Sequence, residues 1–186
     1  MEYSKFLLYS LLIFLNQFTC SLQERKKVVV FLKTDTNFNP VYVSNYTLTI
    51  ANENSTINLD LILIKNITDP LWNLISLEIK FAKENIWSQI MKYDLNYCEL
   101  LQQSRTPMFN LLSVWISNVR KYGTLPKECP ILVGHYSWRN FKLDKHSIPH
   151  FVVKGFYRIG VFLYLKRAEQ KEMVINSTVD IVVKGR

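Results

Sequence analysis

Cys98 and Cys129 are the residues of this sequence whose chemistry is easiest to interpret. Neither has the glycine-rich or histidine-flanked surroundings that activate a catalytic thiolate. In an oxidising compartment two such cysteines are expected to pair, and closing a loop of about 30 residues stabilises a fold by roughly 3 to 4 kcal/mol in the chain-entropy model. We therefore predict a Cys98–Cys129 disulfide rather than a catalytic thiol.

The three histidines, His135, His146 and His150, are the candidate imidazole bases. His146 and His150 are four residues apart, but Pro149 between them disfavours the helix that would make them a metal-binding pair. The sequence has no H-E-x-x-H motif, no G-x-S-x-G motif and no phosphate-binding loop. We therefore expect no catalytic residues, no metal site and no cofactor, and a protein that is not an enzyme.

Four N-x-S/T motifs without proline at the middle position are potential N-glycosylation sites. They begin at Asn45, Asn54, Asn66 and Asn176. Short motifs of this kind also arise by chance, but those at Asn45 and Asn176 are predicted to lie on outward strand faces and that at Asn66 in a polar turn, where a glycan can reach water. The motifs favour a secreted glycoprotein.

The N-terminus resembles a signal peptide. Lys5 precedes an apolar run from Phe6 to Phe18, and the small residues of 19–21 provide a cleavage site. The run is shorter than the roughly 20 apolar residues that a transmembrane helix needs. We predict a signal peptide at residues 1–21, which removes Cys20, and one secreted, extracellular domain at 22–186 with no transmembrane span.

The net charge of +8 would suggest nucleic-acid binding in a cytosolic protein. Secretion argues against such a partner. The basic residues form only small clusters, such as 25–27 and 166–167, which is typical of a solvated surface. Weak attraction to acidic glycans or anionic membranes is the alternative.

Alternation of apolar and polar residues with a period of two dominates the rest of the chain. The alternating segments are 42–50, 57–63, 75–81, 87–93, 153–165 and 173–183. We expect Tyr42 inward and Val43 outward, and we expect bulges or bends at Gly155 and Gly160. Six to eight short strands with polar connections predict an antiparallel sandwich or barrel.

One segment has the spacing of an amphipathic helix instead. Thr106 is a plausible N-cap, Pro107 suits the first helical position, and Gly123 can end the helix in a left-handed conformation. The apolar residues from Met108 to Tyr122 recur at spacings of three and four. We predict a helix over about 107–121 that covers an end or an edge of the sandwich.

Several stretches resemble an insect family of secreted proteins, domain of unknown function 1091, whose members are similar to the lipid-recognition (ML) superfamily. They are 93–98, 125–130, 134–136, 140–141, Pro149 and 155–158. The resemblance covers about half of the chain, from Tyr93 to Lys166, and the first third matches poorly. Many members have further cysteines in the N-terminal strands, which this chain lacks between Leu22 and Tyr97. The resemblance implies an Ig-like two-sheet sandwich with a cavity for a lipid or small hydrophobic ligand, and a role in insect chemosensation.

The candidate ligand-binding residues are large apolar side chains expected to point inward. They are Trp87, Met91, Tyr93, Phe109, Trp115, Tyr157, Ile159, Val161 and Leu163. An ordinary core would contain the same residue types, although an aromatic content of 13% also suits a pocket. The alternative function is a secreted protein-interaction module with a filled core, which binds a cell-surface receptor or a glycan instead of a lipid.

Overall fold

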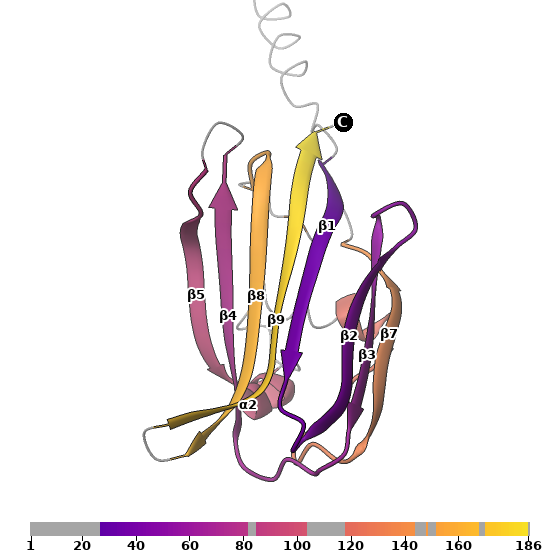
Figure 1. Cartoon of the computed structure of the whole chain (residues 1–186), viewed down its shortest axis with the longest axis vertical. Coiled ribbons are helices and arrows are strands. Elements are labelled where there is room, and N and C mark those ends of the chain that lie inside the picture. The colour runs from indigo at the N-terminus through magenta and orange to yellow at the C-terminus, as the bar shows by residue number, and fades with distance from the viewer. Residues whose placement is uncertain are drawn as a thin grey trace, which may run out of the picture.

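The computed structural model describes residues 27–81, 85–103, 118–143, 148, 152–167 and 170–185. Two antiparallel sheets pack face to face as a sandwich, which confirms the predicted mostly β fold (Figure 1). The predicted signal peptide and most of the predicted helix at 107–121 lie outside the described residues. Within the described segments no helix is both long and apolar enough to cross a membrane.

The first sheet has five strands and the second has four. The order in the first sheet is β1 (Lys27–Phe38), β9 (Gln170–Gly185), β8 (Gly155–Arg167), β4 (Leu71–Lys80) and β5 (Ser88–Asn96). The order in the second sheet is β2 (Val43–Ala51), β3 (Thr56–Leu63), β7 (Gly134–Phe141) and β6 (Gly123–Thr124). A short helix, α2 (Tyr97–Gln103), follows β5 directly.

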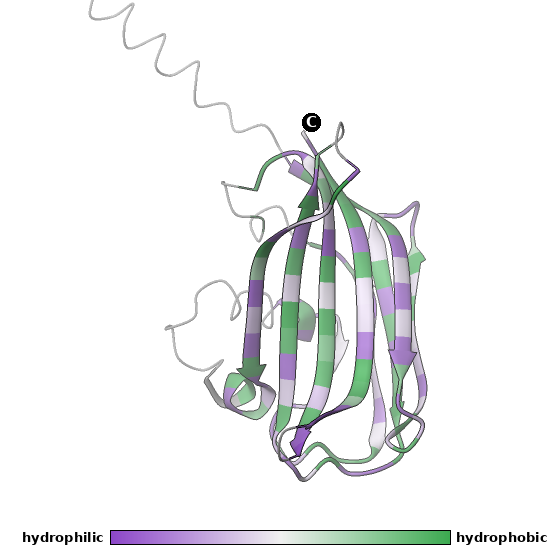
Figure 2. Cartoon of the chain, turned by 60° about the vertical axis from the view of Figure 1, so that its left-hand side comes forward, coloured by the Kyte–Doolittle hydropathy of each residue, from purple (hydrophilic) through white to green (hydrophobic). Residues whose placement is uncertain are grey.

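Alternation along the strands places one face of each sheet in the core, as the sequence predicts. Figure 2 shows apolar and polar residues alternating along the strands of the five-stranded sheet. In β9, Ile175, Ile181 and Val183 are buried, whereas Asn176 and Lys184 are exposed. The inner faces of the two sheets therefore form one shared apolar core.

Three of the expected local details are wrong. Val43 is fully buried instead of pointing outward, because the pairing of β2 with β3 shifts register between Val43 and Asn45 and this irregularity changes which side chains face the core. Val153 begins the segment 153–165, whose apolar residues the alternation places inward, but it precedes β8 and is 52% exposed.

The third error concerns bulges at Gly155 and Gly160. The ladders of β8 continue without a shift at both glycines, and the irregularity lies between Leu163 and Tyr164. At Gly160 a Cβ atom would collide with the Ser76 side chain on the neighbouring strand. Close packing, rather than a bend in the strand, therefore accounts for a glycine at this position.

Hydrogen bonds join the two sheets along the side where β1 lies beside β2 (Figure 1). The Phe31 backbone N–H donates to the carbonyl of Asn54 at 2.8 Å, and the Thr34 hydroxyl donates to the carbonyl of Leu48 at 2.8 Å. Deeper inside, the Tyr46 hydroxyl lies 3.0 Å from the Ser177 hydroxyl. This side of the sandwich is therefore tied together by main-chain and side-chain contacts.

Candidate ligand-binding cavity

A cavity of about 250 Å³ lies between the two sheets. The first sheet supplies one wall, which includes Asn73, Ile75, Val161, Leu163 and Ile175. The second sheet supplies the facing wall, which includes Tyr46, Leu59, Leu61, Tyr136 and Trp138. The lining is mostly aliphatic and aromatic with few polar groups, which is the usual composition of a site for a small apolar ligand.

The cavity explains an uneven burial along the inner face of β8. Tyr157 and Leu165 are 4% and 1% exposed, but Val161 and Leu163 between them are only partly buried. All four side chains share one face of the strand, as their pairing with β4 shows. The sheets are therefore in close contact near the ends of β8 and leave space beside its middle.

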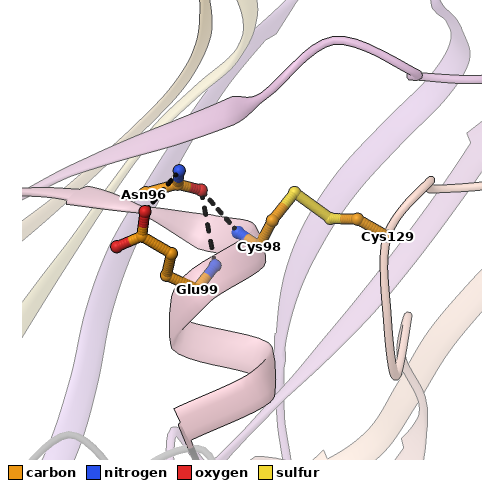
Figure 3. Close-up of a disulfide and its surroundings, with 4 residues drawn as sticks. All are labelled: Asn96, Cys98, Glu99 and Cys129. Atoms are coloured by element: carbon orange, nitrogen blue, oxygen red, sulfur yellow. Dashed lines mark hydrogen bonds between the residues drawn. A yellow bond between two sulfur atoms is a disulfide. The ribbon is translucent and has the colours of Figure 1, made fainter.

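Helix α2 closes part of the cavity with Leu100 and Leu101, which are 9% and 4% exposed. Asn96 caps the start of this helix (Figure 3). Its Oδ1 accepts hydrogen bonds from the N–H groups of Cys98 at 3.0 Å and Glu99 at 3.4 Å. Its Nδ2 donates to Glu99 Oε1 at 3.1 Å. The side chain thus satisfies N–H groups that the first turn leaves unpaired.

The predicted disulfide between Cys98 and Cys129 is confirmed (Figure 3). It joins α2 to the segment that precedes Ile131, which is 4% exposed and also lines the cavity. Ile131 in turn forms a bridge with Ile67 beyond the end of β3. The bond therefore links two parts of the cavity wall, and a disulfide-bonded domain of this kind is consistent with an extracellular location.

The segment 118–126 forms another part of the wall. Within it, Gly123 has a different structural role from the one predicted. The expected left-handed helix end is wrong, because none of the described glycines has a positive φ. Gly123 instead begins β6, where a Cβ atom would collide with the backbone of Ser137 on β7. The missing side chain lets the wall approach β7 closely.

The polar side chains that line the cavity include Tyr97, Asn73 and Trp138. Burial raises the pKa of Tyr97 to about 12, although the positive charge of nearby Arg120 opposes the shift. Asn73 is 7% exposed, and its Oδ1 has no hydrogen-bond partner. The Nε1 of Trp138 is also buried without a partner. Unpaired buried polar atoms are rare in folded proteins.

The structure brings only part of the predicted ligand-binding set together. Val161 and Leu163 line the cavity, whereas Tyr157 and Ile159 pack in the core without lining it. Phe109 and Trp115 lie outside the described residues.

The remaining three predicted residues, Trp87, Met91 and Tyr93, do not line the cavity either. They belong to the edge of the first sheet, where Tyr93 is 47% exposed. The guanidinium carbon of Arg158 lies 4.4 Å from the centre of a Trp87 ring, so Trp87 packs on the outer face of the sheet. An edge strand has a neighbour on one side only, and its alternation does not show how far its side chains reach into the core.

Sequence reasoning missed the residues of α2 and most of the second sheet. Alternation identifies Leu59 and Leu61 as inward-facing residues, but it does not show which strands face each other across the core. The sequence gives even less indication that Tyr136 and Trp138 face inward, because β7 is not an alternating apolar segment. These residues become candidates only when the two sheets are placed together.

The four potential glycosylation sites lie at the surface to different degrees. Asn54, Asn66 and Asn176 are exposed. Asn45 is partly buried, and its Nδ2 donates to Asp60 Oδ1 at 3.2 Å. Glycan occupancy at all four stays a prediction.

A comparison with protein families finds a match over residues 74–159, to the model described as "Protein of unknown function (DUF1091)". This match confirms the family resemblance, and it extends from β4 to the middle of β8. It includes the disulfide, α2 and Trp138, but not Val161 or Leu163. A search of curated proteins finds no match.

Proposed function

Starting from a β-sandwich whose residues 74–159 match DUF1091, we propose that the protein is a secreted glycoprotein that binds a lipid or another small hydrophobic molecule. The observation that carries the proposal is the cavity of about 250 Å³ between the sheets. An engineered apolar cavity of about 150 Å³ binds benzene, and typical ligand pockets begin at about 300 Å³. The volume thus suits a small apolar ligand.

The chemistry of the walls supports an apolar ligand over a polar one. Water in such a cavity finds few hydrogen-bond partners, whereas apolar ligand surface leaves water with a gain of roughly 25 cal/mol per Å². The proposal includes binding without catalysis, because the apolar walls favour retention of a ligand rather than proton transfer. The chemosensory role that the family resemblance implies is part of the same proposal.

The direct test is native mass spectrometry of protein secreted from insect cells and enzymatically deglycosylated. We expect a discrete additional mass, which organic extraction assigns to a lipid or hydrocarbon. Resupplying the extracted compound at a hundredfold excess over its dissociation constant should then stabilise the fold by about 2.7 kcal/mol. An unliganded mass that stays unchanged after incubation with fatty acids, sterols and hydrocarbons would refute the proposal.

The alternative function, a module that binds a receptor or a glycan, has its own support on the outer face of the first sheet. Cationic groups lie over aromatic rings there: Arg158 and Lys80 over Trp87, and Lys166 over Trp72 at 5.0 Å. Aromatic and cationic groups together suit an acidic glycan. Salt-sensitive binding to heparin that Trp87→Ala and Trp72→Ala weaken, combined with an unliganded cavity, would favour this alternative.

A further inference from the structure

We propose that the cavity selects ligands that carry one neutral hydroxyl group on an apolar body, and that Asn73 and Trp138 bind this hydroxyl. The inference rests on the proposed function and specifies the chemical class of its ligand. It starts from two buried polar atoms of the described residues that have no hydrogen-bond partner, both of which belong to residues that line the same cavity.

Asn73 lies on the inner face of β4, in a position where an apolar residue would be expected. Its neighbours on that face are Leu71 and Ile75, and its cross-strand partners are Leu163 on β8 and Leu95 on β5. Only 7% of the residue is exposed, and its Oδ1 accepts no hydrogen bond. An amide oxygen in such surroundings is destabilising unless a donor reaches it. A ligand that brings a donor would satisfy it.

Trp138 presents the complementary group from the facing wall. It lies on β7 of the second sheet, opposite Leu59 of β3, and its Nε1 is buried without an acceptor. An indole nitrogen can only donate a hydrogen bond. Each of the two facing walls thus contains one buried polar atom without a partner, an acceptor on Asn73 and a donor on Trp138.

A hydroxyl group is the smallest neutral group that can form hydrogen bonds with both residues, because it donates one hydrogen bond and accepts others. An ether oxygen can accept from Trp138 but cannot donate to Asn73. A hydrocarbon can do neither. An ionised carboxylate cannot donate to Asn73 and must also lose its hydration to enter an apolar cavity, which is strongly unfavourable.

The probes that separate these classes are decanol, decyl methyl ether, undecane and decanoate, which have similar length and differ in the polar end. Their affinities for the full secreted chain, freed of co-purified ligand, can be measured by displacement of a fluorescent apolar dye. We expect decanol to bind about tenfold more tightly than the ether, and undecane and decanoate to bind more weakly than the ether.

Two substitutions assign the effect to the proposed residues. Asn73→Leu has similar volume and removes the acceptor, so the affinity for decanol should fall about tenfold while that for undecane stays equal or rises. Trp138→Phe removes the donor. It should weaken the binding of decanol and of the ether but not the binding of undecane. Ile75→Leu, on the same strand and the same wall, is the matched control. It should change the affinities for all four probes by the same factor.

The possible results distinguish this inference from the proposed function. If decanol, the ether and undecane bind equally and Asn73→Leu affects them equally, hydroxyl selection is refuted while ligand binding in the cavity stands. If decanoate binds most tightly, the cavity contains an anion site, and hydroxyl selection is refuted. If no probe binds and the secreted protein carries no ligand, both proposals fail.

Discussion

At the scale of single residues, Leu163 and Leu165 show how one strand face serves two purposes. Both side chains point inward from β8, opposite Asn73 and Leu71 of β4. Leu165 is 1% exposed and packs in the continuous core, while Leu163 is partly exposed and borders the cavity. Two leucines of the same strand therefore offer a matched comparison between packing and ligand binding.

We predict that Leu165→Ala lowers the free energy of unfolding by about 2 to 5 kcal/mol, because it creates a void in a close-packed region. Leu163→Ala should be less destabilising, since its side chain already borders empty space, and it should change the affinity for an apolar probe by more than Leu165→Ala does. Urea unfolding and dye displacement on both variants check this. Equal losses of stability and binding in the two variants would mean that Leu163 is an ordinary core residue.

Asp94, on the outer face of the same sheet, makes the fold sensitive to acid. Burial alone would raise the pKa of Asp94, but hydrogen bonds from Lys171 at 3.0 Å and Tyr164 at 2.8 Å outweigh it and hold the pKa below its usual value. A carboxylate with a lowered pKa in the folded state adds stability above its unfolded pKa of about 3.9. That stability is lost as the pH falls through the folded pKa.

Asp94→Asn should therefore lower the free energy of unfolding at neutral pH. It should also make that free energy fall less steeply as the pH is lowered. Urea unfolding between about pH 2 and pH 7 measures both effects. Asp35→Asn, which removes an exposed carboxylate from β1, controls for the change in net charge. A pH profile for Asp94→Asn identical to that of the unsubstituted protein would contradict the prediction.

Residues in regular strands were predictable, and those at irregular positions were not. The inward positions of Leu59, Ile175 and Ile181 follow directly from alternation. Val43 was placed wrongly because a bulge changes the side that a residue faces, and no residue type in the sequence marks this bulge. Asn73 could not be recognised as a cavity residue, because a polar residue at an inward position reads as a break in the pattern.

At the scale of elements, α2 depends on the structure around it. A helix of seven residues is too short to be stable in isolation. The Asn96 cap, the burial of Leu100 and Leu101, and the bond from Cys98 to Cys129 together hold it in place. The cavity wall that it forms is thus only as stable as these attachments.

Replacing both cysteines, as Cys98→Ala with Cys129→Ala, should lower the free energy of unfolding by about 3 to 4 kcal/mol, because the unfolded chain regains the freedom of a 31-residue loop. It should also weaken binding of an apolar probe, since α2 is released from the wall. Denaturant unfolding and dye displacement test the two effects. Unchanged probe affinity in a folded double variant would show that the bond does not maintain the cavity.

The elements were predictable in proportion to the length of their patterns. The long strands β8 and β9 were identified from alternation alone. Helix α2 was missed because the tyrosine and cysteine at its start continue the β-like pattern of β5, and seven residues give too few turns for a helical period. Its real signal is Asn96 followed by Glu99 at the third helical position, which is a capping pattern.

At the scale of the whole molecule, the sandwich has a firmly joined side and a side closed by short elements. Hydrogen bonds connect β1 with β2 and the turn that follows it, at Phe31 and Thr34. Away from this side, the described part of the wall includes α2, Val119, Arg120, Leu125, Pro126 and Ile131. Short elements with few backbone hydrogen bonds open at lower free energy than central strands.

Native-state hydrogen exchange should therefore show the highest protection in β9 and β8, which have a neighbouring strand on both sides, and lower protection in α2 and residues 118–126. Adding a bound apolar ligand should raise protection in α2 and 118–126 more than in β1, because the ligand contacts the former. Exchange measured by mass spectrometry with and without decanol checks this. Uniform protection across the sandwich, or an increase confined to β1 and β2, would contradict it.

The cavity is lined by residues inside and outside the family match, and this has an evolutionary consequence. The family match includes Trp138, α2 and the disulfide, while Leu59, Leu61 and Leu163 lie outside it. The outlying residues take part in neither the disulfide nor the helix cap. Under the proposed function, a duplicated gene would acquire a new ligand preference through changes in β3 or β8 while it inherits the rest of the cavity wall.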